Sequence, residues 1–479
     1  MMMAATDATG GVQARTSNPS LYFFTLVAAL AGFLFGYDTG VIGGTQLYFT
    51  EYFQFTPGQQ GFAVASAIYA CIPGALVAGF LCNAISRKWT MIIAAVMFSV
   101  SAWGSGIADG YGELIIYRVI GGFAIGLASM AAPMLIAEIA PAEERGKLVS
   151  LNQLGIVSGF FVVFLATYFI GGGNTAGLSD AELVARNVYN TEQGWRVMFW
   201  SELLPSLAFF LALFFIPNSP RWLVMKGRTE DAMLVLMRLG ANEATAQSEI
   251  AAIELSLADD TKKSLDPKVL AGLGGLVMVG VMLSVFQQVT GINAILYYGA
   301  EIFSNALGYG PEDALKQQLW LGAVNFLFTF IAIFTVDKWG RKPLLLTGLT
   351  GMFIGLSTLG LTVFTGQLGV LSLIGVLVFI ASFALSMGPV VWVLISEIFP
   401  NRARSLAMAI AVGAQWLFNA FVSNAFPVVN RSQLNEQSFN GALPYFIFAG
   451  FCILAWLFVV KFVPETKGKS LEELEAGLV

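Results

Sequence analysis

The chain has 479 residues, of which 57% are hydrophobic, only 11% are charged and none is histidine. Globular proteins carry roughly 25% charged residues, so this composition excludes an ordinary water-soluble protein. The net charge of -5 says little about partners, because most charged residues lie between long apolar segments.

Twelve apolar segments follow a polar start, residues 1–20, which lacks the short apolar core of a secretory signal. Each segment is close to the ~20 residues of helix that cross a ~30 Å hydrocarbon core. The sequence therefore predicts an all-α membrane protein with 12 transmembrane helices. The predicted spans are residues 21–46, 62–82, 90–108, 112–138, 148–171, 197–216, 269–300, 317–336, 343–364, 368–398, 405–427 and 442–463.

The positive charges between these spans indicate the orientation. Of the 25 Lys and Arg residues, twenty fall on the side of both termini and four on the other side, while Arg118 falls within a span. Cytoplasmic loops carry an excess of Lys and Arg. We therefore expect both termini to be cytoplasmic, in a multi-pass protein of the plasma or inner membrane.

Three short motifs recur in the same order in the two halves of the chain. "EIAPAEERGK" from Glu138 matches "EIFPNRARSL" from Glu397; "RKW" from Arg87 matches part of "DKWGRKP"; and "PNSPRW" matches "PETKGK". The repetition indicates a duplicated six-span unit, with a substrate site at the membrane midplane between the halves.

The repeat divides the chain into five expected parts. These are an N-terminal segment (1–20), a first six-helix half (21–216), a cytoplasmic linker with short helices (217–268), a second six-helix half (269–463) and a cytoplasmic C-terminal tail (464–479).

Several further motifs resemble those of one family. They include "YRVIGGFAIGLAS", "GWRVMF", "QQVTGINAILYY", "DKWGRKP", "GPVVWVLISEIFP" and "PETKGKSLEELE". Together with the duplicated motifs, they make the chain similar to the sugar porters of the major facilitator superfamily over essentially its whole length. The resemblance implies the major facilitator fold and proton-coupled uptake of a monosaccharide, D-xylose or a related pentose or hexose, by alternating access.

Three charged residues lie within spans at a similar expected depth: Asp38, Arg118 and Glu202. At 1.5 Å per residue, all three are roughly 8–12 Å from the outer boundary. We expect Arg118 to pair with Asp38, either as a permanent structural ion pair or as a proton-coupling site. The resemblance favours proton coupling. Glu202 is a weaker candidate, since it could tune the pair or be hydrated near the interface.

A sugar site needs amides to bind hydroxyls and aromatic rings to cover C–H faces. The predicted sugar-binding residues, all implied by the resemblance, are Gln153, Gln287, Gln288, Asn293, Asn325, Trp392, Gln415 and Trp416. The predicted lining or gate residues are Phe35, Tyr297, Tyr298, Gly388 and Pro389. Amides can also join helices without binding a ligand, but Gln287, Gln288 and Asn293 beside Gly291 favour a binding site.

A charged cytoplasmic lock is expected at the inner ends of the spans, with pairs across the two halves. Its predicted members are Arg87, Glu138, Arg145, Arg341, Glu397 and Arg404. Ala84, Ser86, Asn218 and Ser405 depart from the pattern of the family, which has Arg, Gly, Glu and Gly there. These changes remove charge from the lock and favour inward opening.

Other functions fit less well. A facilitator without proton coupling stays open as the first alternative, and a non-transporting sugar sensor is remote because the tail is short. No nucleophile–base pair, metal cluster or nucleotide-binding loop argues for an enzyme, and "RVIGGFAIGLAS" indicates close helix packing. We therefore predict no cofactor, no metal and no nucleic-acid partner; the expected partners are a monosaccharide, a proton and the lipid bilayer, with the protein a monomer.

Overall fold

The computed structural model describes residues 18–141, 144–260, 274–399 and 404–467. Within these ranges the chain forms helices and no strand. Twelve described helices are long and apolar enough to cross a membrane. The predicted all-α class and the predicted number of spans are therefore confirmed.

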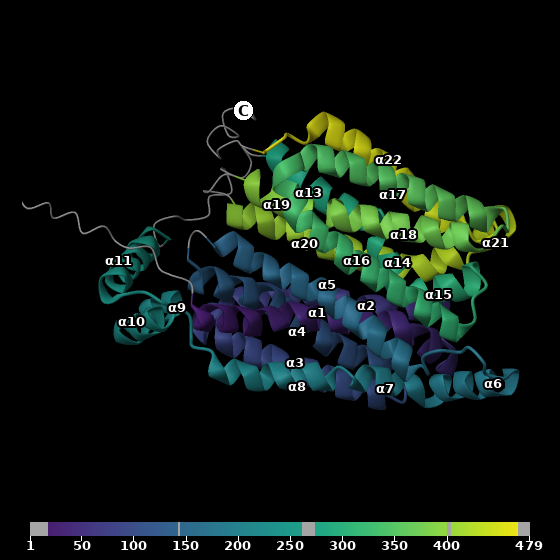
Figure 1. Ribbon diagram of the computed structural model, residues 1–479, viewed down its shortest axis with the longest axis horizontal. Coiled ribbons are helices and arrows are strands. Elements are labelled where there is room, and N and C mark those ends of the chain that lie inside the picture. Colours follow the sequence, from purple (N-terminus) through teal and green to yellow (C-terminus); the bar gives the residue numbers. More distant parts are fainter. Residues whose placement is uncertain (1–17, 142–143, 261–273, 400–403, 468–479) are drawn as a thin grey trace, which may run out of the picture.

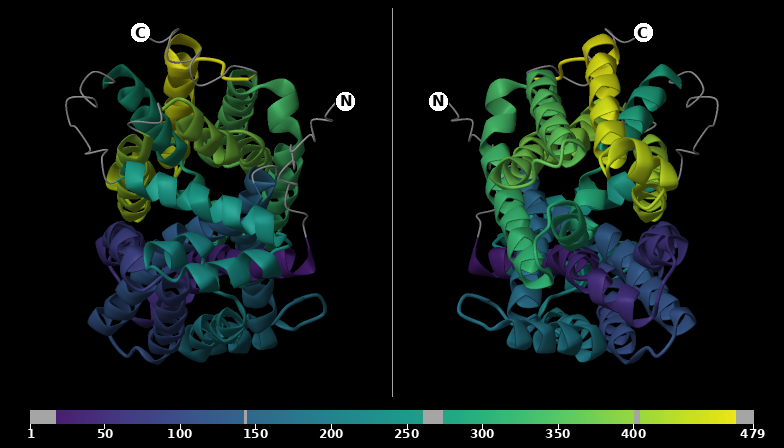
Figure 2. Two further views of the ribbon diagram at one scale, coloured as in Figure 1. Left: turned by 90° about the vertical axis from the view of Figure 1, so that its left-hand side faces the viewer. Right: turned by 90° about the vertical axis from the view of Figure 1, so that its right-hand side faces the viewer.

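The helices form two bodies stacked side by side, with the first half below the second in Figure 1 and the same separation visible end-on in Figure 2. The first half contains α1 (Pro19–Tyr52), α2 (Pro57–Ala84), α3 (Arg87–Ile107), α4 (Tyr111–Ile139), α5 (Arg145–Ile170), α6 (Asp180–Tyr189), the π-helix η1 (Asn190–Gly194), α7 (Trp195–Trp200), α8 (Leu203–Ala212) and the 3-10 turn η2 (Leu213–Phe215).

The second half follows three short helices, α9 (Pro220–Met225), α10 (Thr229–Arg238) and α11 (Glu243–Asp260). Its elements are α13 (Gly274–Val289), α14 (Ile292–Tyr297), α15 (Gly299–Glu301), the π-helix η3 (Ile302–Ala306), α16 (Pro311–Trp339), α17 (Arg341–Phe364), α18 (Val370–Leu385), α19 (Met387–Glu397), α20 (Arg404–Asn430), α21 (Gln433–Phe439) and α22 (Leu443–Phe462). Across the boundary between the halves, α2 packs against α20 and α5 against α16.

Helices α9–α11 lie at one end of the molecule, here named the linker end, and α21 lies at the opposite, far end (Figure 1). The first two of these helices are bonded to the first half. The Trp222 indole donates to the Asn83 carbonyl (3.2 Å), and the Asn18 amide donates to the Arg238 carbonyl (2.8 Å). Lys88 also donates to the Ile216 carbonyl, at 2.8 Å.

Glycines bring the helices of the first half into direct backbone contact. A Cβ on Gly36 of α1 would meet the carbonyl oxygen of Ile156 in α5. A Cβ on Gly122 of α4 would meet the carbonyl oxygen of Ala67 in α2. Small residues allow helices to approach this closely in membranes. The glycine-rich segment around Gly122 is therefore a packing motif, as predicted.

The duplication is visible in backbone geometry at two equivalent helix starts. Ser86 precedes α3 with φ 99° and ψ 162°, and Gly340 precedes α17 with φ 91° and ψ 160°. This region of φ and ψ is adopted almost only by glycine, because it places a Cβ close to backbone atoms. Ser86 therefore carries local strain that Gly340 avoids.

Breaks interrupt the seventh and tenth spans, in the second half of the chain, and the sixth span is much longer than predicted. Gly291, with φ 92°, separates α13 from α14, and Ser386 separates α18 from α19. The helical segment of the sixth span begins at Asp180, whereas the prediction begins at residue 197, because α6 extends the span as an amphipathic helix. The short helices expected between the halves are present as α9, α10 and α11.

Candidate functional site

A cavity of about 120 Å³ lies between the halves, with α1 and α5 on one side and helices of the second half on the other. Twelve predicted residues line it: Phe35, Gln153, Gln287, Gln288, Asn293, Tyr297, Asn325, Gly388, Pro389, Trp392, Gln415 and Trp416. The structure thus gathers residues that are separated by up to several hundred positions in the sequence around one space.

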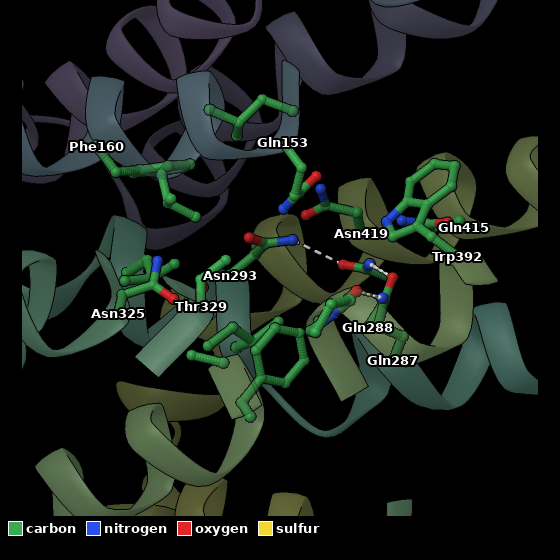
Figure 3. A pocket seen from close by; sticks show the side chains of 18 of the residues that line it. Gln153, Phe160, Gln287, Gln288, Asn293, Asn325, Thr329, Trp392, Gln415 and Asn419 are labelled. Carbon is green, nitrogen blue, oxygen red and sulfur yellow. Dashed lines mark hydrogen bonds between the residues drawn. The ribbon is translucent and has the colours of Figure 1, made fainter. Parts of the chain in front are cut away.

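The broken helix at Gly291 arranges the amides of the cavity. The chain carries Gln287 and Gln288 in the last turn of α13, turns at Gly291 in a left-handed conformation, and begins α14 with Ile292 and Asn293. In a continuous helix, each side chain would leave the axis about 100° from the one before it, so Gln288 and Asn293, five positions apart, would point in different directions. The turn instead places Asn293 against Gln288, as Figure 3 shows.

These amides form a directed chain of hydrogen bonds. Asn293 Nδ2 donates to Gln288 Oε1 (2.7 Å), and Gln288 Nε2 donates to Gln287 Oε1 (3.1 Å). Gln287 Nε2 then donates to the carbonyls of Met387 (2.8 Å) and Gly388 (3.1 Å). The chain joins the break in the seventh span to the break in the tenth. It also leaves the Asn293 Oδ1 atom without a donor among the described residues.

Opposite amides are free to bind a ligand. The side chains of Gln153 and Asn325 make no hydrogen bond to a described residue, although both line the cavity (Figure 3). Phe35 and Trp416 pack against each other with ring centroids 5.5 Å apart. The cavity therefore offers both donors and acceptors beside aromatic faces, which is the combination that a polyhydroxylated ring requires.

Tyr298 does not line this cavity, contrary to its predicted lining or gate position. It is fully buried, its hydroxyl donates to the Ser423 carbonyl (2.8 Å), and its ring stacks on Phe426 at 4.9 Å. The reason is that Tyr298 follows Tyr297 directly, so the two side chains leave the helix about 100° apart. Tyr297 faces the cavity and Tyr298 faces α20.

Sequence reasoning missed Phe160, Thr329 and Asn419, which also line the cavity. Each lies one or two turns after a predicted residue on the same helix. Thr329 follows Asn325 by four positions, and Asn419 follows Gln415 by four. Helical spacing of four residues places side chains on one face, so this signal was available in the sequence.

Asp38 and Arg118 form the predicted ion pair. The Arg118 Nη1 atom donates to Asp38 Oδ1, and both side chains are buried, with 0% and 2% of their surface exposed. The Arg118 guanidinium also lies over the Phe199 ring, 5.9 Å from its centroid. The Asp38 Oδ2 atom accepts no hydrogen bond from a described residue. Arg118 is therefore the main compensation for a buried carboxylate.

Glu202 lies beside this pair and is only 1% exposed, so the interpretation that it is hydrated near the interface is wrong. It lies in the short break between α7 and α8, two helices that pack against α1. The charges of Asp38 and Arg118 both act on its carboxyl group. The equal depth expected for the three residues thus corresponds to a buried cluster of two carboxylates and one guanidinium.

The cavity and this charged cluster are adjacent. Phe35 and Asp38 lie less than one turn apart on α1, the first in the cavity lining and the second in the ion pair. Tyr297 lines the cavity, and the charges of Asp38 and Arg118 reach its hydroxyl group. A ligand that contacts Phe35 or Tyr297 can therefore affect the environment of Asp38.

The predicted lock residues pair within each half. Arg87 contacts Glu138 at 2.7 Å in the first half, and Arg341 contacts Glu397 at 2.8 Å in the second. In this conformation the described ion pairs each join residues of one half, because each Arg begins a helix beside the Glu that ends another helix of its own half. Pairing across the halves when the inner side closes stays a prediction.

The two remaining predicted lock residues, Arg145 and Arg404, belong to neither of these ion pairs. Arg145 is exposed and donates to the Ala137 carbonyl at 3.0 Å. The side chains of Arg404 and Ser405 lie outside the described residues, although their backbone begins α20.

Ser86 and Asn218, two of the residues that depart from the family pattern, form a neutral contact with each other. Ser86 Oγ donates to Asn218 Oδ1 at 2.7 Å in the first half. At the equivalent place in the second half, Glu465 accepts the backbone N–H groups of Arg341 (3.1 Å) and Lys342 (3.0 Å). Burial opposes ionisation of Glu465, but these bonds and that from the Lys467 N–H together lower its pKa. Glu465 is therefore held as a carboxylate.

Side-chain hydrogen bonds between described residues of the two halves lie at the far end. Gln60 donates to Glu301 at 2.7 Å, and Thr175 donates to Asp313 at 3.4 Å. A Cβ on Gly61 of α2 would also meet the Asn424 carbonyl of α20. The halves are thus closed together at the far end.

No metal site is evident. Within the described residues, no group of three or more His, Cys, Asp or Glu side chains is arranged to hold a metal ion. Cys71, Cys82 and Cys452 are buried as free thiols.

Comparison with known proteins places these features in a family. The family model "Sugar (and other) transporter" matches residues 24–478. The chain is 43% identical to the D-xylose-proton symporter of Escherichia coli K12, covering 96% of each chain. It is 37% identical to the glucose facilitated diffusion protein of Zymomonas mobilis, covering 94% of this chain and 96% of that protein.

A solved structure agrees with the sequence relatives. The partially occluded, inward-open conformation of the xylose transporter from E. coli superimposes with a TM-score of 0.81 at 41% identity, covering 95% of this chain and 100% of that one. With this coverage, the match extends over both helical halves. The chain therefore belongs to the sugar transporter family, as a multi-pass membrane protein with the major facilitator fold.

Proposed function

We propose that this protein carries D-xylose, or a related pentose or hexose, into the cell together with a proton by alternating access. The observation that carries this proposal is the adjacency of the amide-lined cavity to the buried Asp38–Arg118 pair. The xylose and arabinose symporters among its relatives support the substrate class.

The charge of the buried cluster supports proton coupling. With Asp38 and Glu202 both ionised, two negative charges accompany one positive charge on Arg118, in a region that the chain shields from water. One bound proton makes the cluster neutral, and burial of net charge is costly. The cluster is therefore suited to hold one proton, and movement of α1 during sugar binding changes its surroundings.

The orientation of the transporter follows from the distribution of positive charge. The linker end is the cytoplasmic end, with both termini there, and the far end is the outer end. The closed far end then corresponds to an inward-facing state, and the division of the chain into residues 1–20, 21–216, 217–268, 269–463 and 464–479 describes its working parts. The protein acts as a monomer in the plasma or inner membrane, and it is not an enzyme.

The pairs Arg87–Glu138 and Arg341–Glu397 form the proposed cytoplasmic lock, although each pair joins two residues of the same half. Each stabilises the inner end of its own half, and the two ends meet when the inner side closes. Both pairs are largely shielded from water, since none of the four side chains is more than 29% exposed. Several such pairs at a bistable interface can change which state predominates.

The first test measures sugar-dependent proton uptake in proteoliposomes, with wild type and Asp38→Asn. We expect xylose to drive protons into wild-type vesicles, because the cluster takes up one proton per cycle. Asp38→Asn should exchange labelled sugar without net proton uptake or accumulation. Asp231→Asn is the matched control, since Asp231 pairs with Arg228 on the surface and should leave coupling unchanged.

A facilitator is the second candidate, since a relative that is 37% identical is a facilitated diffusion protein. Wild-type vesicles would then equilibrate sugar without moving protons, and Asp38→Asn would change folding stability alone. That result would contradict proton coupling and leave the sugar site in place. Running xylose and glucose in parallel distinguishes a pentose carrier from a hexose carrier.

Gln288 provides a test of the sugar site. Gln288→Leu removes the link between Asn293 and Gln287 and leaves both amides without their partner. We expect sugar affinity, measured by isothermal titration calorimetry, to fall about 5- to 150-fold, because each hydrogen bond contributes ~0.5–1.5 kcal/mol and two are lost. Gln317→Leu, on α16 outside the lining, is the control. Equal affinity of both variants would contradict the assignment.

A further inference from the structure

A second buried carboxylate, Glu301, lies at the far end and belongs neither to the cavity nor to the Asp38 cluster. It ends α15, four residues after Tyr297, and only 1% of its surface is exposed. Burial of a carboxylate in a membrane protein is costly unless charged or polar groups compensate it. The position of those groups indicates what Glu301 does.

Each oxygen of Glu301 has a different partner. Oε1 accepts from Arg431, which follows α20 in the same half, at 2.9 Å. Oε2 accepts from Gln60 Nε2, on α2 in the other half, at 2.7 Å. One carboxylate therefore connects the end of the eleventh span with the start of the second. These spans pack against each other along the boundary between the halves.

Gln60 is fixed in orientation by a second contact. Its Nε2 group also donates to Gln46 Oε1 on α1, so both amide hydrogens are used. Gln46 and Gln60 are both buried. A carboxylate accepts hydrogen bonds only, so it matches an amide that presents its two donors. Bonds to charged groups are also stronger than neutral ones.

The other ionisable groups near Glu301 are tyrosines. Tyr298, on the same segment, and Tyr445, on α22, both lie within reach of its charge. The Tyr298 hydroxyl donates to Ser423, and the Tyr445 hydroxyl has no hydrogen-bond partner among the described residues. The positive charge facing Glu301 within the described chain is that of Arg431.

We propose that Glu301 is a positioning residue that holds the far end of the transporter closed, through Arg431 on its own half and Gln60 on the other. Opening of the far end must separate Gln60 from Glu301, because they belong to different halves. The carboxylate then loses its partner on the first half and gains water. The Glu301 contact with Gln60 thus favours the inward-facing state. This inference rests on alternating access, as proposed above, but not on proton coupling.

The two partners of Glu301 should have unequal effects when they are replaced. Glu301→Gln leaves Arg431 without its carboxylate, but Arg431 is 35% exposed and can turn to water. Arg431→Gln leaves a buried carboxylate without its cation, which is much more unfavourable. Hydration of that carboxylate requires the far end to open. We therefore expect Arg431→Gln to open the far end more than Glu301→Gln does.

The experiment measures the distance across the far end by double electron–electron resonance in nanodiscs. Spin labels on cysteines at Gly112 and Leu434 report on the first and second halves. Both positions are exposed, and a Cβ at Gly112 meets no atom within 4 Å. The native cysteines are buried, so they should label poorly. The variants are Glu301→Gln, Arg431→Gln and Gln60→Leu, with Glu436→Gln, an exposed carboxylate on α21, as the control.

We expect Glu301→Gln and Gln60→Leu to raise the ratio of the longer to the shorter distance about tenfold, which corresponds to ~1.4 kcal/mol. Arg431→Gln should raise it further, and Glu436→Gln should leave it unchanged. The Glu301→Gln/Gln60→Leu double variant should raise this ratio little more than either single variant does, because both substitutions remove the same Gln60–Glu301 interaction. Unchanged distances in all variants that keep the wild-type melting temperature would overturn the inference, whatever the proton measurements show.

Discussion

Replacing Arg118 with methionine is expected to lower the free energy of unfolding by ~3–5 kcal/mol, because it leaves Asp38 buried without its cation. Asp38 has no exposed surface, and its Oδ2 atom has no donor among the described residues. Glu202 beside it adds a second negative charge. The thermal unfolding midpoint of the purified protein in detergent measures the loss.

The double variant Asp38→Asn/Arg118→Met distinguishes the stability lost through an unpaired charge from that lost through the packing of the Arg118 side chain. It removes both members of the pair, so we expect most of the lost stability to return while proton coupling stays absent. Arg228→Met serves as a control, because its partner Asp231 lies at the surface and the pair contributes at most ~1 kcal/mol. If the double variant is as unstable as Arg118→Met, the packing of Arg118 against Phe199, rather than its charge, is what stabilises this region.

The second large effect concerns the contact of α4 with α2. Gly122→Ala should destabilise the protein by ~3 kcal/mol or more, because the added methyl group would overlap the Ala67 carbonyl and only movement of a whole helix relieves the overlap. We expect a lower melting temperature and a lower yield of folded protein in the membrane fraction.

Gly79→Ala on α2 is the matched control for this prediction. A Cβ at Gly79 meets no atom within 4 Å, and alanine favours a helix over glycine by ~1 kcal/mol. The same chemical change should therefore be neutral or stabilising at this position. Similar melting temperatures for the two variants would show that α2 and α4 separate easily, contrary to the packing described here.

Much of the architecture could be predicted because the membrane makes strong demands on sequence. Each span needs about twenty apolar residues, so the number of spans could be read directly. The depth of Asp38, Arg118 and Glu202 could be counted from span ends, since helix rise is constant. Their meeting in one cluster follows from equal depth together with the high cost of isolated charge.

Details that depend on neighbouring helices could not be predicted in this way. The side on which Tyr298 lies is decided by the packing of α14 against α20. The burial of Glu202 depends on the packing of α7 and α8 against α1, which its distance from a span end does not reveal. The repeat motifs alone also do not say which Arg faces which Glu, so the ion pair found within each half could not be predicted.

The break at Ser386 was also missed, although Pro389 follows it. A proline within a span is compatible with either a kink or an interruption. The break at Gly291, by contrast, could be anticipated because a glycine lies among polar amides. The order of hydrogen bonds from Asn293 through Gln288 to Gln287 needs the folded geometry of both breaks.

The hydrogen bonds of α9 and α10 to the first half mean that these helices move with that half and not with the second. Trp222 and Arg238 are fastened to Asn83 and Asn18, so these helices turn with the first half when the two bodies rock. Because α11 packs against α9 and α10, all three helices move with the first half, and the connection between the two moving bodies comes after α11 rather than at the end of the sixth span. A fluorophore on α10 would consequently record the tilt of the first half against the second.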